Sequence, residues 1–144
     1  MYKPQHFAGH ELFDEKYYGE ILPVLGDRIF IIYDARVLVT ADRLRKRFGP
    51  IKVNDWKWGG GFNFRGFRPP GCTVGAAFSQ HRFGRALDMD PVNVEAEEIR
   101  QDMIAKPNEA TYEYITAIET DISWLHYDVR NHSKHELGLL VFKP

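Results

Sequence analysis

The stretch Ser79–Asp88 constrains the fold more than any other part of this sequence. It places an imidazole, His81, and a carboxylate, Asp88, on either side of a turn that contains Gly84. If the chain reverses direction at this glycine, both side chains can point the same way and bind one metal ion. The fold must then supply the remaining ligands from elsewhere in the chain.

A second histidine with a suitable setting is His126. It lies in the segment 123–129, where apolar and polar residues alternate as in a strand, so that Trp124 and Asp128 share its face. Two histidines and one aspartate form a three-ligand set, which is typical of catalytic zinc, whereas structural zinc has four ligands, mostly cysteines. Each residue taken singly is more often structural, as a hydrogen-bonded core histidine or a capping aspartate. The three together predict a zinc (Zn2+) site.

Length and charge limit the class of protein. The chain has 144 residues, which we interpret as a single domain, 1–144, and its formal net charge of -1 predicts no general attraction to nucleic acid or to an anionic membrane. No segment approaches the roughly 20 apolar residues of a membrane span. The first residues lack the features of a signal peptide, so we expect a cytoplasmic product. The lone cysteine, Cys72, is interpreted as a loop or packing residue.

The pattern of apolar residues predicts an α+β fold. Between positions 34 and 48 apolar residues recur at steps of three and four before Gly49-Pro50, which predicts an amphipathic helix. A second helix is predicted from Asn93, as its cap, to about Ala105. Strands are predicted at 51–56, 86–90, 123–129 and 137–142, the last two as a hairpin. We therefore expect a small antiparallel sheet with helices packed on one side.

A long segment from Trp58 to about Ala77 is rich in glycine, proline and aromatic residues. Loops of this length inside a compact domain are usually functional or disordered, and the aromatic content argues against disorder. We expect this loop to frame a cleft.

At this point the sequence resembles a known family. The pattern Ser79-x-His81-x-x-Gly84-x-Ala86-x-Asp88 is similar to the signature of the M15 peptidases, which comprise zinc D-alanyl-D-alanine carboxypeptidases, dipeptidases and phage endopeptidases related in fold to the hedgehog signalling domain. The segment 65–69 resembles the family's loop with a substrate-binding arginine, and 124–128 resembles its third-ligand strand. The resemblance covers roughly residues 35–130.

The resemblance implies roles for individual residues. His81, Asp88 and His126 would ligate zinc, Arg68 would pair with a substrate carboxylate, and Ser79 would hydrogen-bond the substrate near the scissile bond. Arginine suits bidentate carboxylate capture. The alternatives are a loop salt bridge for Arg68 and a turn-forming hydroxyl for Ser79. Beyond the ligands, Asp128 is expected to face the same side as His126 and to orient a ligand or Arg130.

The proton-transfer residue is where this chain departs from part of the family. Many members carry glutamate three residues before the last histidine ligand, but Ser123 occupies that position here and cannot act as a general base. Asp121, five residues before His126, is the first candidate and Glu119, seven before it, is the second. Both are also plausible as solvated turn carboxylates.

The resemblance implies zinc-dependent hydrolysis of an amide bond in peptidoglycan stem peptides. Whether the bond joins D-Ala to D-Ala or L-Ala to D-Glu stays open. The expected setting is a phage or prophage lysis enzyme released through holin pores, with cytoplasmic D-Ala-D-Ala dipeptide as a second possible substrate. Two rivals remain: a zinc-containing binding module of the same fold without turnover, which the missing glutamate favours weakly, and a metal-free phage structural protein.

Overall fold

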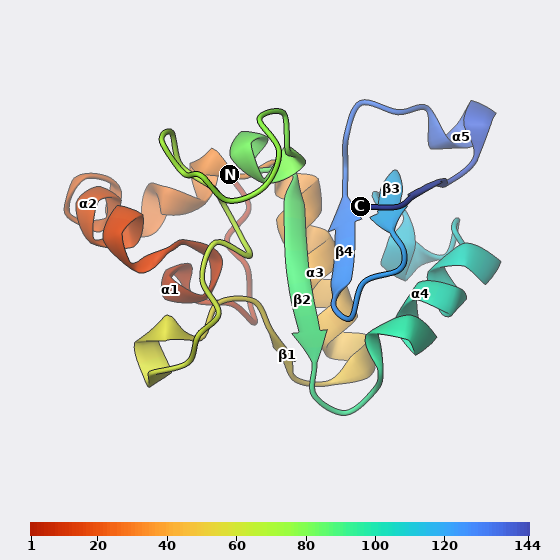
Figure 1. Ribbon diagram of the computed structural model, residues 1–144, viewed down its shortest axis with the longest axis horizontal. Helices are drawn as coiled ribbons and strands as arrows, with labels where there is room; N and C mark the ends of the chain where they lie inside the picture. Colours follow the sequence, from red (N-terminus) through yellow and green to blue (C-terminus); the bar gives the residue numbers. More distant parts are fainter.

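The computed structural model describes all residues from 1 to 144 (Figure 1). The helices are α1 (Gly9–Leu12), α2 (Glu15–Leu25), α3 (Ala35–Phe48), α4 (Ala96–Ala105) and α5 (Lys134–Leu137), joined by the 3-10 turns η1 (Gly26–Ile32), η2 (Trp56–Trp58), η3 (Gln80–Phe83) and η4 (Ala110–Tyr112). The strands are β1 (Ile51–Lys52), β2 (Ala86–Pro91), β3 (Ala117–Glu119), β4 (Leu125–Asp128) and β5 (Leu140–Phe142). No helix combines the length and the apolar character that crossing a membrane requires.

The five strands form one mixed sheet in the order β1-β2-β4-β3-β5. All neighbours are antiparallel except β3 and β5, which run parallel. The register sets Asp88 opposite His126, His126 opposite Glu119, and Glu119 opposite Phe142. Since directly paired residues share a face of the sheet, these four side chains form one row across four strands. We call them the ligand row.

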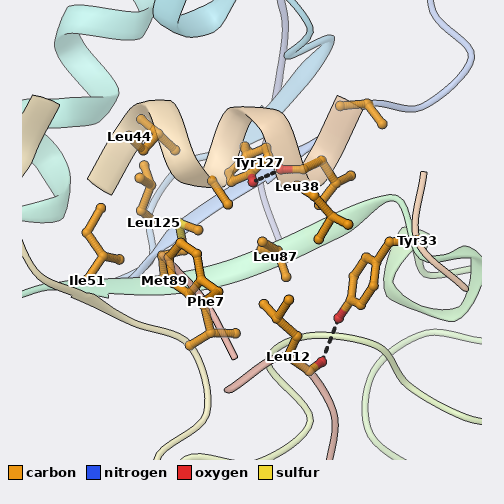
Figure 2. Close-up of a cluster of buried hydrophobic side chains, with 14 of the residues drawn as sticks. Phe7, Leu12, Tyr33, Leu38, Leu44, Ile51, Leu87, Met89, Leu125 and Tyr127 are labelled. Carbon is orange, nitrogen blue, oxygen red and sulfur yellow. Dashed lines mark hydrogen bonds between the residues drawn. The ribbon is translucent and has the colours of Figure 1, made fainter. Parts of the chain in front are cut away.

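The opposite face of the sheet is apolar and packs against α3. Leu87, Met89, Leu125 and Tyr127 alternate with the residues of the ligand row, and each is fully buried. Figure 2 shows them beneath α3, where the hydroxyl of Tyr127 donates to the carbonyl of Val37 over 2.8 Å. Asp34 begins α3 by accepting from the amide of Arg36, as an N-cap residue does. One face of the sheet therefore belongs to the hydrophobic core, and the other carries the ligand row.

The loop before η3 is fixed to the N-terminal segment by a buried tyrosine. The hydroxyl of Tyr33 donates to the carbonyl of Leu12 and accepts from the amide of Phe67, both over 2.6 Å. Gly66 lies against the same segment so closely that a Cβ atom there would stand 1.9 Å from the Leu12 carbonyl oxygen. On its other side the loop meets β2, where the backbone amide of Asp88 donates to the backbone carbonyl of Arg65 over 2.9 Å. The predicted long loop is thus ordered beside the ligand row.

The predicted α+β class and the helix at 34–48 are confirmed, but the purely antiparallel sheet and the final hairpin are wrong. Both edges of β4 are occupied, one by β2 and the other by β3, so the last strand cannot pair with it. The segment between β4 and β5 contains α5 in place of a tight turn, and it carries the chain across β3 to the far edge.

Two element boundaries also differ from the prediction. The strand predicted at 51–56 ends at Lys52, because Asn54 is held outside the sheet. The backbone amide of Asn54 donates to the backbone carbonyl of Glu11, and its side-chain oxygen accepts from the backbone amide of Arg65. The helix predicted from Asn93 is α4, and it begins at Ala96. Its N-cap is Glu95 and not Asn93, since Glu95 and Glu98 form a capping box.

Candidate metal centre

His81, Asp88 and His126 converge on the polar face of the sheet. His81 comes from η3, Asp88 from β2 and His126 from β4, and their exposed fractions are 1%, 6% and 6%. One atom of each lies within 4.8 Å of the other two. The distances are 3.3 Å from His81 Nε2 to Asp88 Oδ1, 3.4 Å from His81 Nε2 to His126 Nδ1, and 2.7 Å from His126 Nδ1 to Asp88 Oδ1. This buried group could hold a metal ion.

The outer nitrogen of each imidazole has a partner that orients the ring. Nδ1 of His81 donates to the carbonyl of Gly66 over 2.8 Å. A carbonyl oxygen only accepts, so Nδ1 carries the proton and Nε2 presents its lone pair to the group. Nε2 of His126 lies 3.4 Å from Asp128 Oδ2, which leaves Nδ1 facing Asp88. Such outer partners are a recurrent feature of metal-binding histidines.

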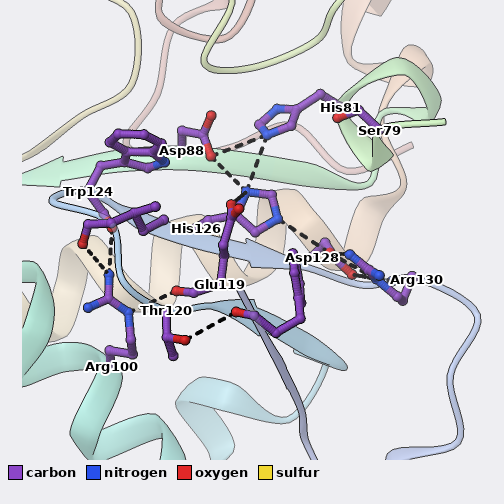
Figure 3. A network of polar contacts seen from close by, with 12 residues as sticks. Ser79, His81, Asp88, Arg100, Glu119, Thr120, Trp124, His126, Asp128 and Arg130 are labelled. Atoms are coloured by element: carbon purple, nitrogen blue, oxygen red, sulfur yellow. Dashed lines mark hydrogen bonds and ion pairs between the residues drawn. The ribbon is translucent and has the colours of Figure 1, made fainter. Parts of the chain in front are cut away.

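Asp128 is confirmed on the same side as His126 and contacts Arg130. Its side chain is fully buried and accepts from the amide of Arg130 over 3.1 Å and from Nε of the same arginine over 2.8 Å. Figure 3 shows the resulting chain from Asp88 through His126 and Asp128 to Arg130. Asp128 therefore links the ring of His126 to a cation at the rim of the site.

The charges of the group follow from burial and pairing. Burial alone would lower the pKa of His126, but hydrogen bonds to Asp128 and Asp88 outweigh it and raise that pKa to about 9. Burial lowers the pKa of His81. Burial opposes ionisation of Asp88, yet the two imidazoles hold its pKa below the usual range. In the protein alone Asp88 is thus a carboxylate beside a protonated His126, and a metal ion held at Nδ1 would take the place of that proton.

Arg68 and Ser79 lie at the wall of the same site. Nη2 of Arg68 donates to Asp88 Oδ2 over 3.0 Å, Nη1 to Ser79 Oγ over 3.3 Å, and Nε to the carbonyl of Phe64 over 2.8 Å. Asp88 therefore turns one oxygen toward the histidines and the other toward Arg68. The alternative of a loop salt bridge is realised for Arg68, although two of its five N–H groups have no partner among these contacts.

The structure separates the two proton-transfer candidates. Glu119 belongs to the ligand row, is 17% exposed, and places Oε2 3.9 Å from His126 Nδ1. Asp121 lies outside the sheet, where its side chain is 60% exposed and pairs with Lys143 over 2.8 Å. The backbone of Asp121 has a φ of 61°, in the left-handed region. Glu119 is thus brought together with the ligands and Asp121 is not.

A cavity of about 570 Å³ opens over the ligands. Besides the predicted site residues, its wall includes Trp124, which the sequence placed on the face of His126, and Arg130, which it named as a partner of Asp128. The wall also includes Phe142 and Lys143, to which the sequence assigned no place. Trp124 and Arg130 continue the alternation of His126 and Asp128, so this signal was available. Phe142 and Lys143 reach the site through the parallel pairing of β5, for which the sequence gives no comparable signal.

Comparison with known proteins found no matching protein-family model, no matching curated protein and no matching solved structure.

Proposed function

We propose that this chain is a zinc peptidase that hydrolyses an amide bond in peptidoglycan stem peptides, as a lysis enzyme of phage or prophage origin. The observation that carries the proposal is the convergence of His81, Asp88 and His126 at the floor of a cavity whose wall also holds Glu119 and Arg68. The resemblance of these segments to the M15 peptidases supplies the reaction and the substrate class.

The donor set fits zinc. Two imidazole nitrogens and one carboxylate oxygen are the ligands of many catalytic zinc sites, which keep a further position open. Tetrahedral zinc with bonds of about 2.0–2.1 Å separates its ligand atoms by roughly 3.3 Å. The two distances from His81 Nε2, 3.3 and 3.4 Å, match that separation. The 2.7 Å contact between His126 and Asp88 is that of a hydrogen bond and must lengthen when an ion binds.

Zinc, when bound, acidifies a water molecule and polarises a carbonyl group. The chain must supply the proton transfer, and Glu119 is the carboxylate placed to do so. It is mostly buried beside His126, and it can accept a proton from the attacking water and deliver it to the leaving amine. Asp121 points to Lys143 and away from the reacting groups. We therefore assign the general base to Glu119.

The cations of the cavity favour an anionic substrate. Arg68 retains two unpaired N–H groups that can bind a carboxylate. Arg130 and Lys143 also line the wall, although each is paired with an aspartate, Asp128 and Asp121 respectively. Stem peptides carry a free D-glutamyl carboxylate and a carboxylate at the C-terminus. Ser79, which accepts from Arg68, has its hydroxyl proton available for the peptide near the scissile bond.

The test is digestion of purified peptidoglycan, with the released fragments identified by mass spectrometry. We expect new D-Ala or L-Ala and D-Glu termini that disappear when zinc is chelated and return when it is restored. Glu119→Gln should lower the rate by about 10²- to 10⁴-fold while zinc stays bound. Asp121→Asn is the matched control and should retain near-normal activity.

The possible outcomes separate the rivals. Zinc-loaded protein that releases nothing contradicts the peptidase and favours a binding module of the same fold. Protein purified without chelator that contains no metal contradicts the zinc site itself. A loss of activity in Asp121→Asn and not in Glu119→Gln would reverse the assignment of the base.

A further inference from the structure

A second cavity, of about 420 Å³, lies at the β1 edge of the sheet, away from the ligand row. Its wall combines charged and polar side chains with an exposed indole: Glu11, Arg45, Lys52, Asn54, Asp55 and Trp58. These residues come from α1, α3, β1 and the segment that leads into η2 and through it. None of these residues contributes to the metal centre. We call it the edge cavity.

The charges in the edge cavity cancel. Arg45 and Glu11 pair with each other over 3.5 Å, and the remaining ionic groups are one cation, Lys52, and one anion, Asp55. Neither Lys52 nor Asp55 has an ion-pair partner within 4.0 Å, although Asp55 Oδ1 accepts from the amide of Phe62 over 2.7 Å. The cavity therefore presents unpaired donors and acceptors without net charge. That combination suits a neutral ligand rich in hydroxyl and amide groups.

The aromatic wall is held in place although it is exposed. Trp58 is 65% exposed, and its ring makes an edge-on contact with the ring of His10, with centroids 5.0 Å apart and planes at 71°. An edge-on contact occupies at most one face of the indole, so the other stays free. The free face of an aromatic ring is electron-rich and attracts the C–H groups on the flat face of a sugar ring.

Two further features show that the polar side of the edge cavity is built. A Cβ atom at Gly60 would lie 2.0 Å from the carboxyl group of Asp55. Any residue other than glycine at this position would therefore clash with the carboxylate where it now lies. Asn54 is 1% exposed, and its side-chain oxygen accepts from Arg65, which identifies Nδ2 as the donor. That Nδ2 has no partner in the protein. A buried donor left unpaired is costly and is usually satisfied by ordered water.

We infer that the edge cavity is a carbohydrate-binding site, with Trp58 as the stacking platform and Lys52 and Asp55 as the hydrogen-bonding groups. Sugar binding follows from the cavity alone, whereas the choice of an N-acetylated amino sugar rests on the proposed function, because stem peptides are attached to a glycan of such sugars. A glycan at β1 would leave the metal centre open to the peptide.

The test uses the full chain and tetra-N-acetylchitotetraose as the probe, with binding followed by calorimetry and by the NMR signals of the three indole N–H groups. We expect Trp58→Ala to weaken binding at least tenfold, because the stacking surface is lost. Phe83→Ala is the control, since Phe83 is also exposed, at 52%, but lies outside both cavities. The Trp58 indole signal should shift on binding, and the Trp124 signal, at the metal centre, should not.

Chelation separates this inference from the peptidase. Binding that is equal in zinc-loaded and chelated protein supports the edge cavity, even if no peptide is ever released. No binding by the native chain at millimolar probe overturns the inference. So does equal binding by Trp58→Ala, or binding that needs the metal, because either result places the sugar elsewhere.

Discussion

The buried side chain of Asp128 contacts both Arg130 and His126. It is fully buried, accepts from the amide and side chain of Arg130, and faces Nε2 of His126. Burial opposes its ionisation, but the hydrogen bonds from His126 and Arg130 lower the pKa of Asp128 below its usual range. The carboxylate therefore stays charged and keeps the ring of His126 turned toward Asp88.

We expect Asp128→Asn to reduce zinc affinity about 10- to 100-fold, as is typical when an outer partner of a metal-binding histidine is removed. The side-chain amide of the asparagine can both donate and accept, so it no longer fixes, as the carboxylate of Asp128 does, which nitrogen of His126 is protonated. Competition with a chromophoric chelator measures the effect. Asp121→Asn, an exposed aspartate paired with Lys143, should leave zinc affinity unchanged, and equal losses in both variants would contradict the role of Asp128.

The convergence of His81, Asp88 and His126 could be predicted from the sequence because their signals are local. His81 and Asp88 flank a glycine turn, and His126 and Asp128 follow the period of a strand. The order of preference between Asp121 and Glu119 could not be predicted, because it depends on where β3 ends. The left-handed backbone at Asp121 turns that side chain away from the face that Glu119 shares with His126.

At the scale of elements, one buried arginine ties α4 to the sheet. Arg100 is 1% exposed and donates to three backbone carbonyls: Nε to Glu119 over 2.9 Å, and Nη2 to Trp124 over 2.7 Å and to Ile122 over 3.2 Å. The carbonyl of Glu119 ends β3, and the other two belong to the segment that joins β3 to β4. The helix thus fixes the end of β3, where Glu119 lies, and the connection that carries Trp124.

Arg100→Ala should lower the free energy of unfolding by about 3 kcal/mol or more, because each buried carbonyl left without a donor costs about 1–3 kcal/mol. Urea denaturation measures the change. The neighbouring exposed residue provides the control, and Gln101→Ala should stay within about 0.5 kcal/mol of the native protein. A loss below 1 kcal/mol in Arg100→Ala would mean that water reaches these carbonyls.

A further prediction concerns Gly84, in the turn between His81 and Asp88. Gly84 has a φ of 64°, and a Cβ atom there would lie 2.3 Å from the carbonyl oxygen of Ile32. We expect Gly84→Ala to destabilise the protein by more than about 2 kcal/mol and to weaken metal binding, since strain and a clash act together. Gly19→Ala in α2, where nothing lies within 4 Å, should instead stabilise it by up to about 1 kcal/mol.

At the scale of the whole molecule, the metal centre joins parts of the chain that are distant in sequence. His81 comes from η3, Asp88 from β2 and His126 from β4, and the loop that orients His81 is itself fixed to the N-terminal segment through Tyr33. An ion bound there holds these parts together only in the folded state. Binding should therefore stabilise the entire domain.

Zinc at 100 times its dissociation constant should add about 2.7 kcal/mol to the free energy of unfolding. For a chain of this size that corresponds to a rise in melting temperature of roughly 5 °C or more. Differential scanning calorimetry with and without chelator measures it. His126→Ala should show no response to zinc, whereas His132→Ala, outside the metal centre, should respond like the native protein; a zinc response in His126→Ala would place the ion elsewhere.

The α+β class and the polar face of the sheet could be predicted, because they depend on periodicity within single elements. The topology could not, since pairing of β5 with β3 depends on which edges remain open after β2 and β3 have flanked β4. The edge cavity was missed for the same reason. Glu11, Arg45 and Trp58 come from α1, α3 and η2, and no local pattern relates them.

The ligand row also links strand pairing to metal uptake. A shift of one residue between β2 and β4 would turn His126 toward the apolar face while Asp88 remained on the polar one, and the ligands would no longer meet. The amount of metal taken up after refolding therefore counts the molecules whose strands have paired correctly. If the chain binds zinc as proposed, a zinc titration is an assay of folding fidelity that requires neither a substrate nor an active enzyme.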